Sequence, residues 1–151
     1  MENTSCYSYF AICSNGVIKD GIGFVANPNS DFDPEYITNK LKIEPHETIK
    51  MGTVRKRGNA EYSFSSWTAC FQTEPALDVE AQCLNIAKAL KGKISLLLEL
   101  KQEFDVNFTI NIVPHIYNEE TPALSFNKEF IEFCYLTGTE LEIDLYVFGK
   151  E

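Results

Sequence analysis

Two stretches of the chain alternate between apolar and polar residues, and this alternation limits the fold more than any other feature. In residues 106–113 and 140–148 every second side chain is apolar, which is the period of a β-strand with one buried face. In the second stretch we expect Leu141, Ile143, Leu145 and Val147 to face inward, and Glu140, Glu142, Asp144 and Tyr146 to face outward. A sheet buried on both faces would show continuous apolar runs. The pattern therefore predicts a sheet with helices mainly on one face.

The first predicted helix is short and has clear ends. Asp33 is a good N-cap, and Pro34 suits the first helical position, where its missing N–H costs nothing. Pro45 disfavours helical geometry at the residue before it, so the helix ends by about there. Further strands are predicted at residues 7–14, 21–26 and 67–73, with Asn15-Gly16 as a turn between the first two and Pro75 at the end of the third.

Three more helices are predicted in the second half of the chain. Asp78 caps a helix whose apolar residues keep helical spacing up to Gly92. The next, over residues 94–104, is apolar nearly all round, so we expect it to be the most buried helix. Asn127 caps the last helix and Gly138 ends it. Its expected inward residues are Phe130, Ile131 and Cys134.

This order of elements predicts a single α+β domain over residues 1–151, with a mixed or antiparallel sheet. The two ends share the order strand, long loop, short capped helix and strand. We therefore expect an internal pseudo-duplication of the form β-α-β, helix pair, β-α-β. In it, the helix after Asp33 corresponds to the helix after Asn127, and the strand at 67–73 corresponds to the strand at 140–148.

The composition favours a cytoplasmic protein with a substantial core. A chain of 151 residues with 44% hydrophobic residues can bury such a core. The net charge of -9 argues against general binding to nucleic acid or to anionic lipid, and it favours a basic partner. The five cysteines contain no Cys-x-x-Cys pair, as expected for reduced thiols. We see no signal peptide and no apolar run long enough for a membrane anchor.

The acidic residues are concentrated toward the C-terminal end. Residues 99–151 hold 11 acidic and 3 basic side chains, whereas residues 1–98 hold 11 and 10. The residues that we expect to form one continuous partner-binding surface are Glu119, Glu120, Glu129, Glu132, Glu140, Glu142, Asp144 and Tyr146. Such a surface either only keeps a protein soluble or steers a basic protein onto it. A row of like charges on one strand repels itself, and a basic partner would relieve that repulsion.

A second candidate site is the loop of residues 50–67. The segment 40–67 holds six of the thirteen basic residues, including both arginines. Guanidinium groups bind phosphate, and aromatic rings stack on bases. The residues that would line an anion or nucleotide pocket are Lys50, Arg55, Lys56, Arg57, Tyr62 and Trp67. The other interpretation is a mobile hairpin with Trp67 as a core anchor.

Few residues are arranged for catalysis or metal binding. His46 and His115 lie in predicted loops beside prolines, and a catalytic site would need partners brought to them by the fold. The chain has no His-x-x-x-His, no Cys-x-x-Cys and no calcium loop, so we expect no metal and no cofactor. It also lacks a Gly-rich phosphate loop and a nucleophile elbow. No catalytic residue is predicted.

A longer pattern runs through most of the chain. It consists of Asp-Pro-x-x-Ile-Thr-x-x-Leu-x-Ile-x-Pro over residues 33–45, Lys-x-Gly over 50–52, Ser-x-Trp over 65–67, and a closing strand with Ile, Asp and Tyr in 143–146. The basic residues 55–57 are not part of it. This pattern resembles a bacterial family of small α+β domains of unknown function. Families of this size and kind are often encoded beside toxin genes, so the resemblance implies an immunity role.

These observations predict a non-enzymatic cytoplasmic binding protein. It would act as an immunity-type protein that neutralises a basic partner, such as a bacterial toxin, through its acidic surface. The first alternative is binding or sequestration of a small anion or nucleotide by the loop 50–67. The second is an enzyme that uses His46 or His115. The sequence makes no prediction of oligomeric state.

Overall fold

The computed structural model describes residues 2–74 and 78–149, so Pro75, which we expected to end a strand, lies outside the described residues. The strands are β1 (Ser5–Ser14), β2 (Gly16–Lys19), β3 (Gly23–Ala26), β4 (Glu47–Ile49), β5 (Ser66–Glu74), β6 (Val106–Ile116), β7 (Glu140–Ile143) and β8 (Tyr146–Val147). The helices are α1 (Pro34–Leu41), α2 (Val79–Leu90), α3 (Ile94–Glu103) and α4 (Lys128–Thr137), with a 3-10 turn, η1 (Lys91–Lys93), between α2 and α3.

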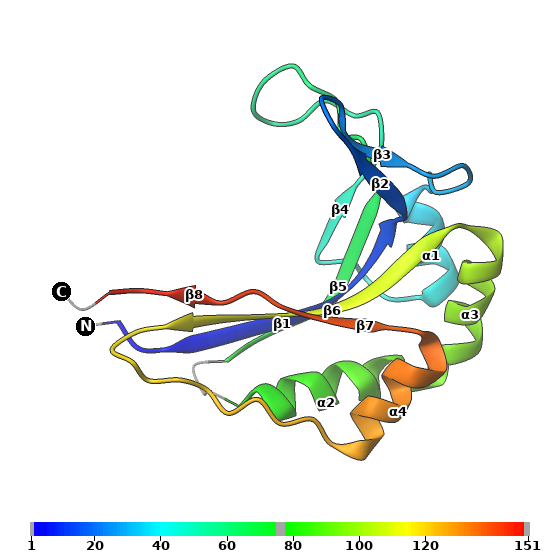
Figure 1. The fold of residues 1–151 in the computed structure, drawn as a ribbon. Helices are drawn as coiled ribbons and strands as arrows, with labels where there is room; N and C mark the ends of the chain where they lie inside the picture. Colours follow the sequence, from blue (N-terminus) through cyan, green and yellow to red (C-terminus); the bar gives the residue numbers. More distant parts are fainter. Residues whose placement is uncertain (1, 75–77, 150–151) are drawn as a thin grey trace. The chain divides into compact units, whose positions relative to one another are not determined.

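The main sheet is mixed, and the predicted α+β fold is confirmed. Its strands lie in the order β4-β5-β1-β6-β7, and β8 also pairs with β6 (Figure 1). β4 and β5 are antiparallel, whereas β6 is parallel to β7 and to β8. The segment that contains α4 connects β6 to β7, and parallel neighbours require a long crossover of this kind.

The chain divides into two compact units. The first comprises Met1–Phe10, Cys70–Gly92 and Thr109–Glu151, and the second comprises Ala11–Ala69 and Lys93–Phe108. β1, β5 and β6 are long enough to contribute residues to both units. Each unit has a helix pair of its own, α2 with α4 in the first and α1 with α3 in the second.

In the first unit, α2 and α4 cover one face of the strands (Figure 1). Cys6, Ser8 and Phe10 alternate along β1 and are each at most 2% exposed. Gln82 of α2 joins the helix to this face, because its Oε1 accepts a hydrogen bond from Ser8 Oγ (2.7 Å) and its Nε2 donates to the carbonyl of Cys6 (2.8 Å). Both ends of this buried amide are therefore satisfied.

In the second unit, Trp67 anchors α1. The helix begins as predicted, with Asp33 accepting from the amide of Glu35 (3.0 Å), and it ends at Lys42 in a left-handed conformation (φ 57°). The Trp67 side chain is fully buried, and its Nε1 donates to Thr38 Oγ1 (3.0 Å). The tryptophan is thus a core residue with its one polar atom paired.

In the second unit, Asp105 lies just before β6 and connects its own loop to two others, one before β2 and one after β3. Its carboxylate accepts from the side-chain amides of Asn15 (2.9 Å) and Asn27 (3.0 Å), and its backbone N–H donates to the carbonyl of Asn29 (2.9 Å). The hydrogen bonds from Asn15 and Asn27 lower the pKa of Asp105. The stability that this carboxylate contributes is therefore present at neutral pH and is lost as the pH falls through its lowered pKa.

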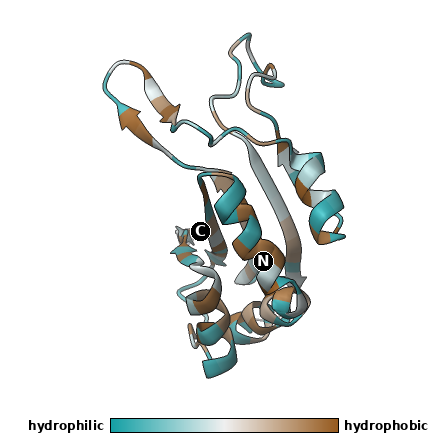
Figure 2. Ribbon diagram, turned by 90° about the vertical axis from the view of Figure 1, so that its right-hand side faces the viewer, coloured by the Kyte–Doolittle hydropathy of each residue, from teal (hydrophilic) through white to brown (hydrophobic). Residues whose placement is uncertain are grey.

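Burial of the helices differs from the prediction in two places. α3 buries only Leu97 and Leu100, while Leu98 is 41% exposed, because a helix packed on one side cannot bury three consecutive leucines. α2 is more deeply buried, through Val79, Gln82, Cys83, Ile86, Ala87 and Leu90. In α4, Ile131 was expected to face inward but is 54% exposed. The helices accordingly show hydrophobic and hydrophilic residues side by side along their length (Figure 2).

The N-terminal strands pair differently from the prediction. Residues 7–14 and 21–26 were expected to pair with each other, but β1 lies between β5 and β6 in the main sheet. β3 pairs instead with β2, a strand that the sequence analysis missed, in a separate two-stranded ribbon. Gly16 belongs to β2 and is not a turn residue. A Cβ at Gly16 would lie 2.2 Å from the carbonyl oxygen of Val25, so this close pairing requires glycine.

Pro114 explains why the last strand is interrupted. We expected it to begin a loop, but it lies within β6, between Ile112, which pairs with Ile143, and His115, which pairs with Tyr146. Proline has no N–H to donate, so the ladder is broken opposite it and resumes one residue later. The single strand predicted for residues 140–148 therefore appears as β7 and β8.

The last strand is also an exposed edge, which corrects the inward face that we expected. Leu141 and Ile143 are 40% and 42% exposed, and Leu145 and Val147 are 54% and 72% exposed. β7 ends the strand order of the sheet, so among the described residues it has a neighbouring strand on one side only. Alternation shows that a strand has two different faces, but it does not show that either face is covered.

Among the described residues, no helix has the length and apolar character to cross a bilayer.

All five cysteines lie in the described part of the chain, and none forms a disulfide. Burial raises the pKa of the Cys83 thiol to about 12 and that of Cys134 to about 11. Both thiols therefore stay protonated and poorly reactive at neutral pH.

Replacing Thr38 with valine should destabilise the protein by about 1–3 kcal/mol, because it leaves the buried indole N–H of Trp67 without its acceptor. Urea denaturation followed by the fluorescence of the only tryptophan measures this cost. Thr53→Val is the matched control, since the hydroxyl of Thr53 is exposed, and it should change stability by less than about 0.5 kcal/mol. Equal costs for the two variants would contradict the anchoring role.

Candidate binding surface

The last strands place three carboxylates on one face of the sheet. Ile112 pairs with Ile143 and His115 pairs with Tyr146, so the register is the same on both sides of the break between β7 and β8. Side chains two residues apart therefore stay on the same face throughout this segment. The acidic residues that share the face of Tyr146, which we call the acid row, are Glu140, Glu142 and Asp144.

Aromatic rings continue this face beyond the acid row. The ring centre of His115 lies 5.2 Å from that of Tyr146, 5.8 Å from that of Phe148 and 5.7 Å from that of Tyr7. Tyr7 in turn lies 5.4 Å from Phe71. Two more tyrosines join through stacked contacts, so the complete ring cluster consists of Tyr7, Tyr9, Phe71, His115, Tyr117, Tyr146 and Phe148.

The ring cluster lies on the face that α2 and α4 leave uncovered. In β1, Tyr7 and Tyr9 are half-buried, whereas Ser8 between them is buried beneath α2. Successive residues of a strand point to opposite faces, so the two tyrosines face away from the helices. Tyr146 and Phe148 are 46% and 40% exposed. The acid row and the ring cluster together form what we call the acid-aromatic face.

The charge on this face is not neutralised within the described part of the chain. None of the ion pairs found there includes a member of the acid row. Asp144 is hydrogen-bonded to the hydroxyl of Tyr146, and this interaction raises the pKa of Tyr146. Aromatic rings carry negative potential on their faces and attract cations, above all arginine. The acid-aromatic face therefore offers two kinds of partner to a basic side chain.

Of the other acidic residues predicted for one continuous surface, two lie on the opposite side of the strands and two lie in a loop. Glu129 and Glu132 belong to α4, on the helix-covered side of the strands, and Glu129 Oε1 lies 3.9 Å from Lys91 Nζ. Glu119 and Glu120 lie in the loop after β6. The structure thus brings together Glu140, Glu142, Asp144 and Tyr146 and separates the two α4 residues from them.

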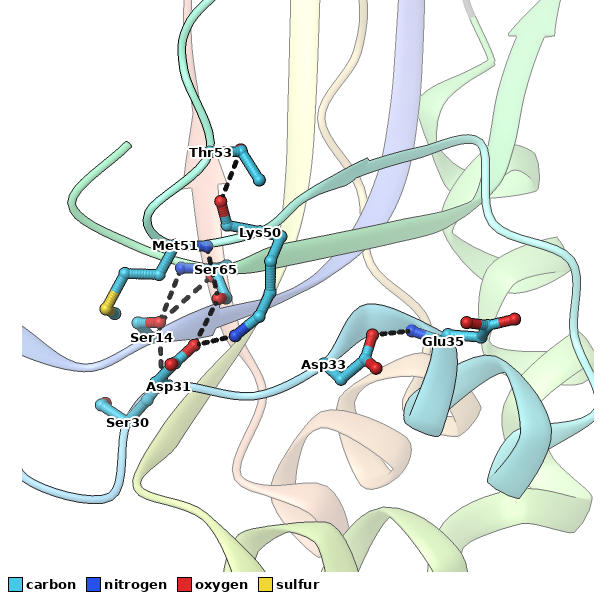
Figure 3. Close-up of polar contacts among 9 residues, drawn as sticks. All are labelled: Ser14, Ser30, Asp31, Asp33, Glu35, Lys50, Met51, Thr53 and Ser65. Carbon is cyan, nitrogen blue, oxygen red and sulfur yellow. Dashed lines mark hydrogen bonds and ion pairs between the residues drawn. The ribbon is translucent and has the colours of Figure 1, made fainter. Parts of the chain in front are cut away.

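In the second unit, Lys50 belongs to a polar cluster at the base of the basic loop. Its Nζ lies 2.5 Å from Asp31 Oδ1, which also accepts from Ser65 Oγ (3.1 Å) (Figure 3). Ser65 Oγ accepts from the amide of Met51 (3.0 Å), and the amide of Ser65 donates to Ser14 Oγ (2.9 Å). These bonds hold the two ends of the loop together and neutralise the lysine.

The other residues predicted to line the anion or nucleotide pocket do not come together around one. The guanidinium carbon of Arg55 lies 5.1 Å from the ring centre of Tyr62, so these two residues contact each other. Lys56 and Arg57 are exposed in the loop. Trp67 is fully buried and cannot stack on a ligand, which favours its interpretation as a core anchor.

A cavity of about 540 Å³ lies beside α1. Of the residues predicted to bind an anion, Lys50 alone lines it, together with carboxylates that include Asp33, Glu35 and Glu44. This lining disfavours an anion, because the acidic groups outnumber the one cation.

The two histidines lie in different units, His46 in the second and His115 in the first. The backbone N–H of His46 donates to the carbonyl of Thr68 (2.7 Å), and His115 sits among the rings of the acid-aromatic face. In residues 2–74 and 78–149, no group of three or more His, Cys, Asp or Glu side chains is placed to hold a metal ion. The contacts of His115 with Tyr7, Tyr146 and Phe148 place its ring within the packing of the ring cluster.

The sequence analysis missed most of the ring cluster because its members come from strands far apart in the chain. Tyr146 alone was predicted for the surface. The alternation Tyr7-Ser8-Tyr9 was the available signal, since it places two rings on one face of a strand. For Phe71 the sequence was misleading, because its alternation with Trp67 and Ala69 predicts one shared face. Cys70 has a left-handed backbone (φ 56°) that interrupts this alternation, and Phe71 instead contacts Tyr7 and Tyr9.

The chain belongs to a family defined by a domain of unknown function, DUF4279, whose model matches residues 4–148. This match confirms the resemblance to a family of small α+β domains without an assigned function. Neither a curated protein nor a solved structure gives a match to the chain.

Replacing Asp144 with asparagine should lower the pKa of Tyr146 toward the ordinary value of about 10, because a phenolate no longer has to form beside a carboxylate. Titration of ¹³C-labelled tyrosine by NMR measures this pKa. Tyr117 is the internal control, since its raised pKa comes from a hydrogen bond to Glu2 and should not change. An unchanged pKa of Tyr146 would show that the two side chains do not meet on this face.

Proposed function

We propose that the chain is a non-enzymatic cytoplasmic binding protein that holds a basic protein partner on the acid-aromatic face. The observation that carries this proposal is the common register of β7 and β8, which sets three carboxylates beside a partly exposed ring cluster. Within the described residues, these carboxylates form no ion pair. Lysine and arginine side chains would meet the carboxylates near the sheet edge and the ring faces next to them. The acidic excess in residues 99–151 adds attraction at longer range.

The narrower form of the proposal is an immunity-type protein that neutralises a basic toxin, such as a nuclease. An inhibitor of this kind must capture its target quickly, and complementary charge raises the rate of association. A row of carboxylates is also suited to occupy a positively charged active site. The acid row supports this role through its charge and its exposure.

The alternatives have less support from the geometry. An anion or nucleotide pocket loses two of its proposed contacts, because Lys50 is paired with Asp31 and Trp67 is buried. An enzyme built on His115 would have to use a side chain that packs against the rings of Tyr7, Tyr146 and Phe148.

Reversing two charges of the acid row, with Glu140→Lys and Glu142→Lys together, should weaken the binding of an oligoarginine peptide by about tenfold to a hundredfold, because attraction becomes repulsion at two positions. Isothermal titration calorimetry at low ionic strength measures the affinity. The matched control is Glu129→Lys with Glu132→Lys on α4, which changes the net charge equally on the helix-covered side.

The control should retain most of the affinity, since its residues lie outside the acid-aromatic face. Equal losses in the two double variants would mean that the peptide responds only to net charge. A larger loss in the α4 variant would place the binding surface on that helix. Either result would contradict the proposed function.

A further inference from the structure

The outer edge of β7 and β8 is an open edge of the main sheet within the described residues. In the described residues these strands pair with β6 and with no other strand. The amides of Asp144 and Phe148 donate to the carbonyls of Ile112 and Ile116, both at 2.9 Å. Because the amides of successive strand residues point to opposite sides, those of Ile143, Leu145 and Val147 point away from β6.

The side chains along this edge form two contrasting rows. On one face lies the acid row, and on the other lie Leu141, Ile143, Leu145 and Val147, which are 40–72% exposed. Soluble proteins usually shorten, cover or charge the edges of their sheets. This edge is charged on one face only, and it keeps a continuous apolar row on the other face.

The charge of the acid row argues against a second copy of the chain as the occupant of this edge. Two copies that pair antiparallel about a two-fold axis perpendicular to the sheet would bring one acid row beside the other. Like charges directly opposite each other in neighbouring strands are destabilising. A strand that carries basic side chains at alternate positions would have the opposite effect, and apolar side chains between them would cover the apolar row.

We propose that an extended segment of the basic partner adds to this edge as the next strand of the sheet. Its alternate lysine or arginine side chains lie along the acid row, and its intervening apolar side chains lie along Leu141, Ile143 and Leu145. The main-chain bonds to the outward amides supply affinity, and the two side-chain rows supply specificity. The basic character of this partner rests on the proposed function, whereas the strand geometry is the new element.

Residue-resolved amide exchange, measured by NMR on the ¹⁵N-labelled protein, tests this mode of binding. The probe is a short peptide of alternating arginine and valine, and its control is a peptide of the same composition with the arginines in one block. When the alternating peptide is bound, the outward amides of Ile143, Leu145 and Val147 should exchange with solvent at least about tenfold more slowly than in the free protein. The inward amides of Asp144 and Phe148 already donate to β6 and should change little.

Three results would overturn this proposal. Binding of the alternating peptide without protection of the outward amides would mean docking through side chains alone, and the proposed function would survive. Equal protection of the outward amides by the block peptide would show that the alternation of basic and apolar side chains in the partner strand is not recognised. Protection in the free protein that increases with its own concentration would assign the edge to a second copy. If oligoarginine also fails to bind, the proposed function fails with it.

A backbone variant separates strand addition from charge attraction. Ile143→Pro removes an outward N–H while leaving the acid row intact, and Ile143→Ala is the matched control that keeps the N–H. We expect the proline variant to lose most of its affinity for the alternating peptide and to keep its affinity for oligoarginine. Equal affinities of the proline and alanine variants for the alternating peptide would contradict strand addition. The exchange experiment on the unmodified protein stands independently if the proline variant does not fold.

Discussion

The parallel pairing of β6 with β7 and β8 is the interaction on which the candidate surface depends. Pro114 interrupts the ladder without shifting it, so the residues before and after the break keep the same faces. A slip of one residue would turn the acid row toward the helices and the apolar row toward the ring cluster. The chemistry of the acid-aromatic face is therefore a direct consequence of one strand register.

Stability and the proposed binding depend on different parts of the sheet. Buried polar groups in each unit have their partners, as Gln82 has with Ser8 and Trp67 has with Thr38. In contrast, the last strand exposes both of its rows and holds like charges side by side, which costs folding energy. The proposed binding of a cationic strand would relieve this repulsion and cover the apolar row.

The helices and most strands could be predicted from the sequence because their signals are local. Asp33, Asp78 and Asn127 each cap the helix predicted for them, since an N-cap acts on the turn that follows it. The ring cluster could not be predicted because it depends on the strand order and on which face the helices cover. The exposure of Leu141 escaped prediction for the same reason, since an edge is a property of the whole sheet.

Photo-crosslinking in the cells that make the protein tests the central claim most directly. A photoreactive phenylalanine analogue replaces either Tyr146 on the acid-aromatic face or Tyr135 on α4, which is 83% exposed. We expect a covalent adduct with a basic polypeptide from position 146, identified by mass spectrometry, and no such adduct from position 135. An adduct formed from position 135 and not from position 146 would contradict the assignment of this face.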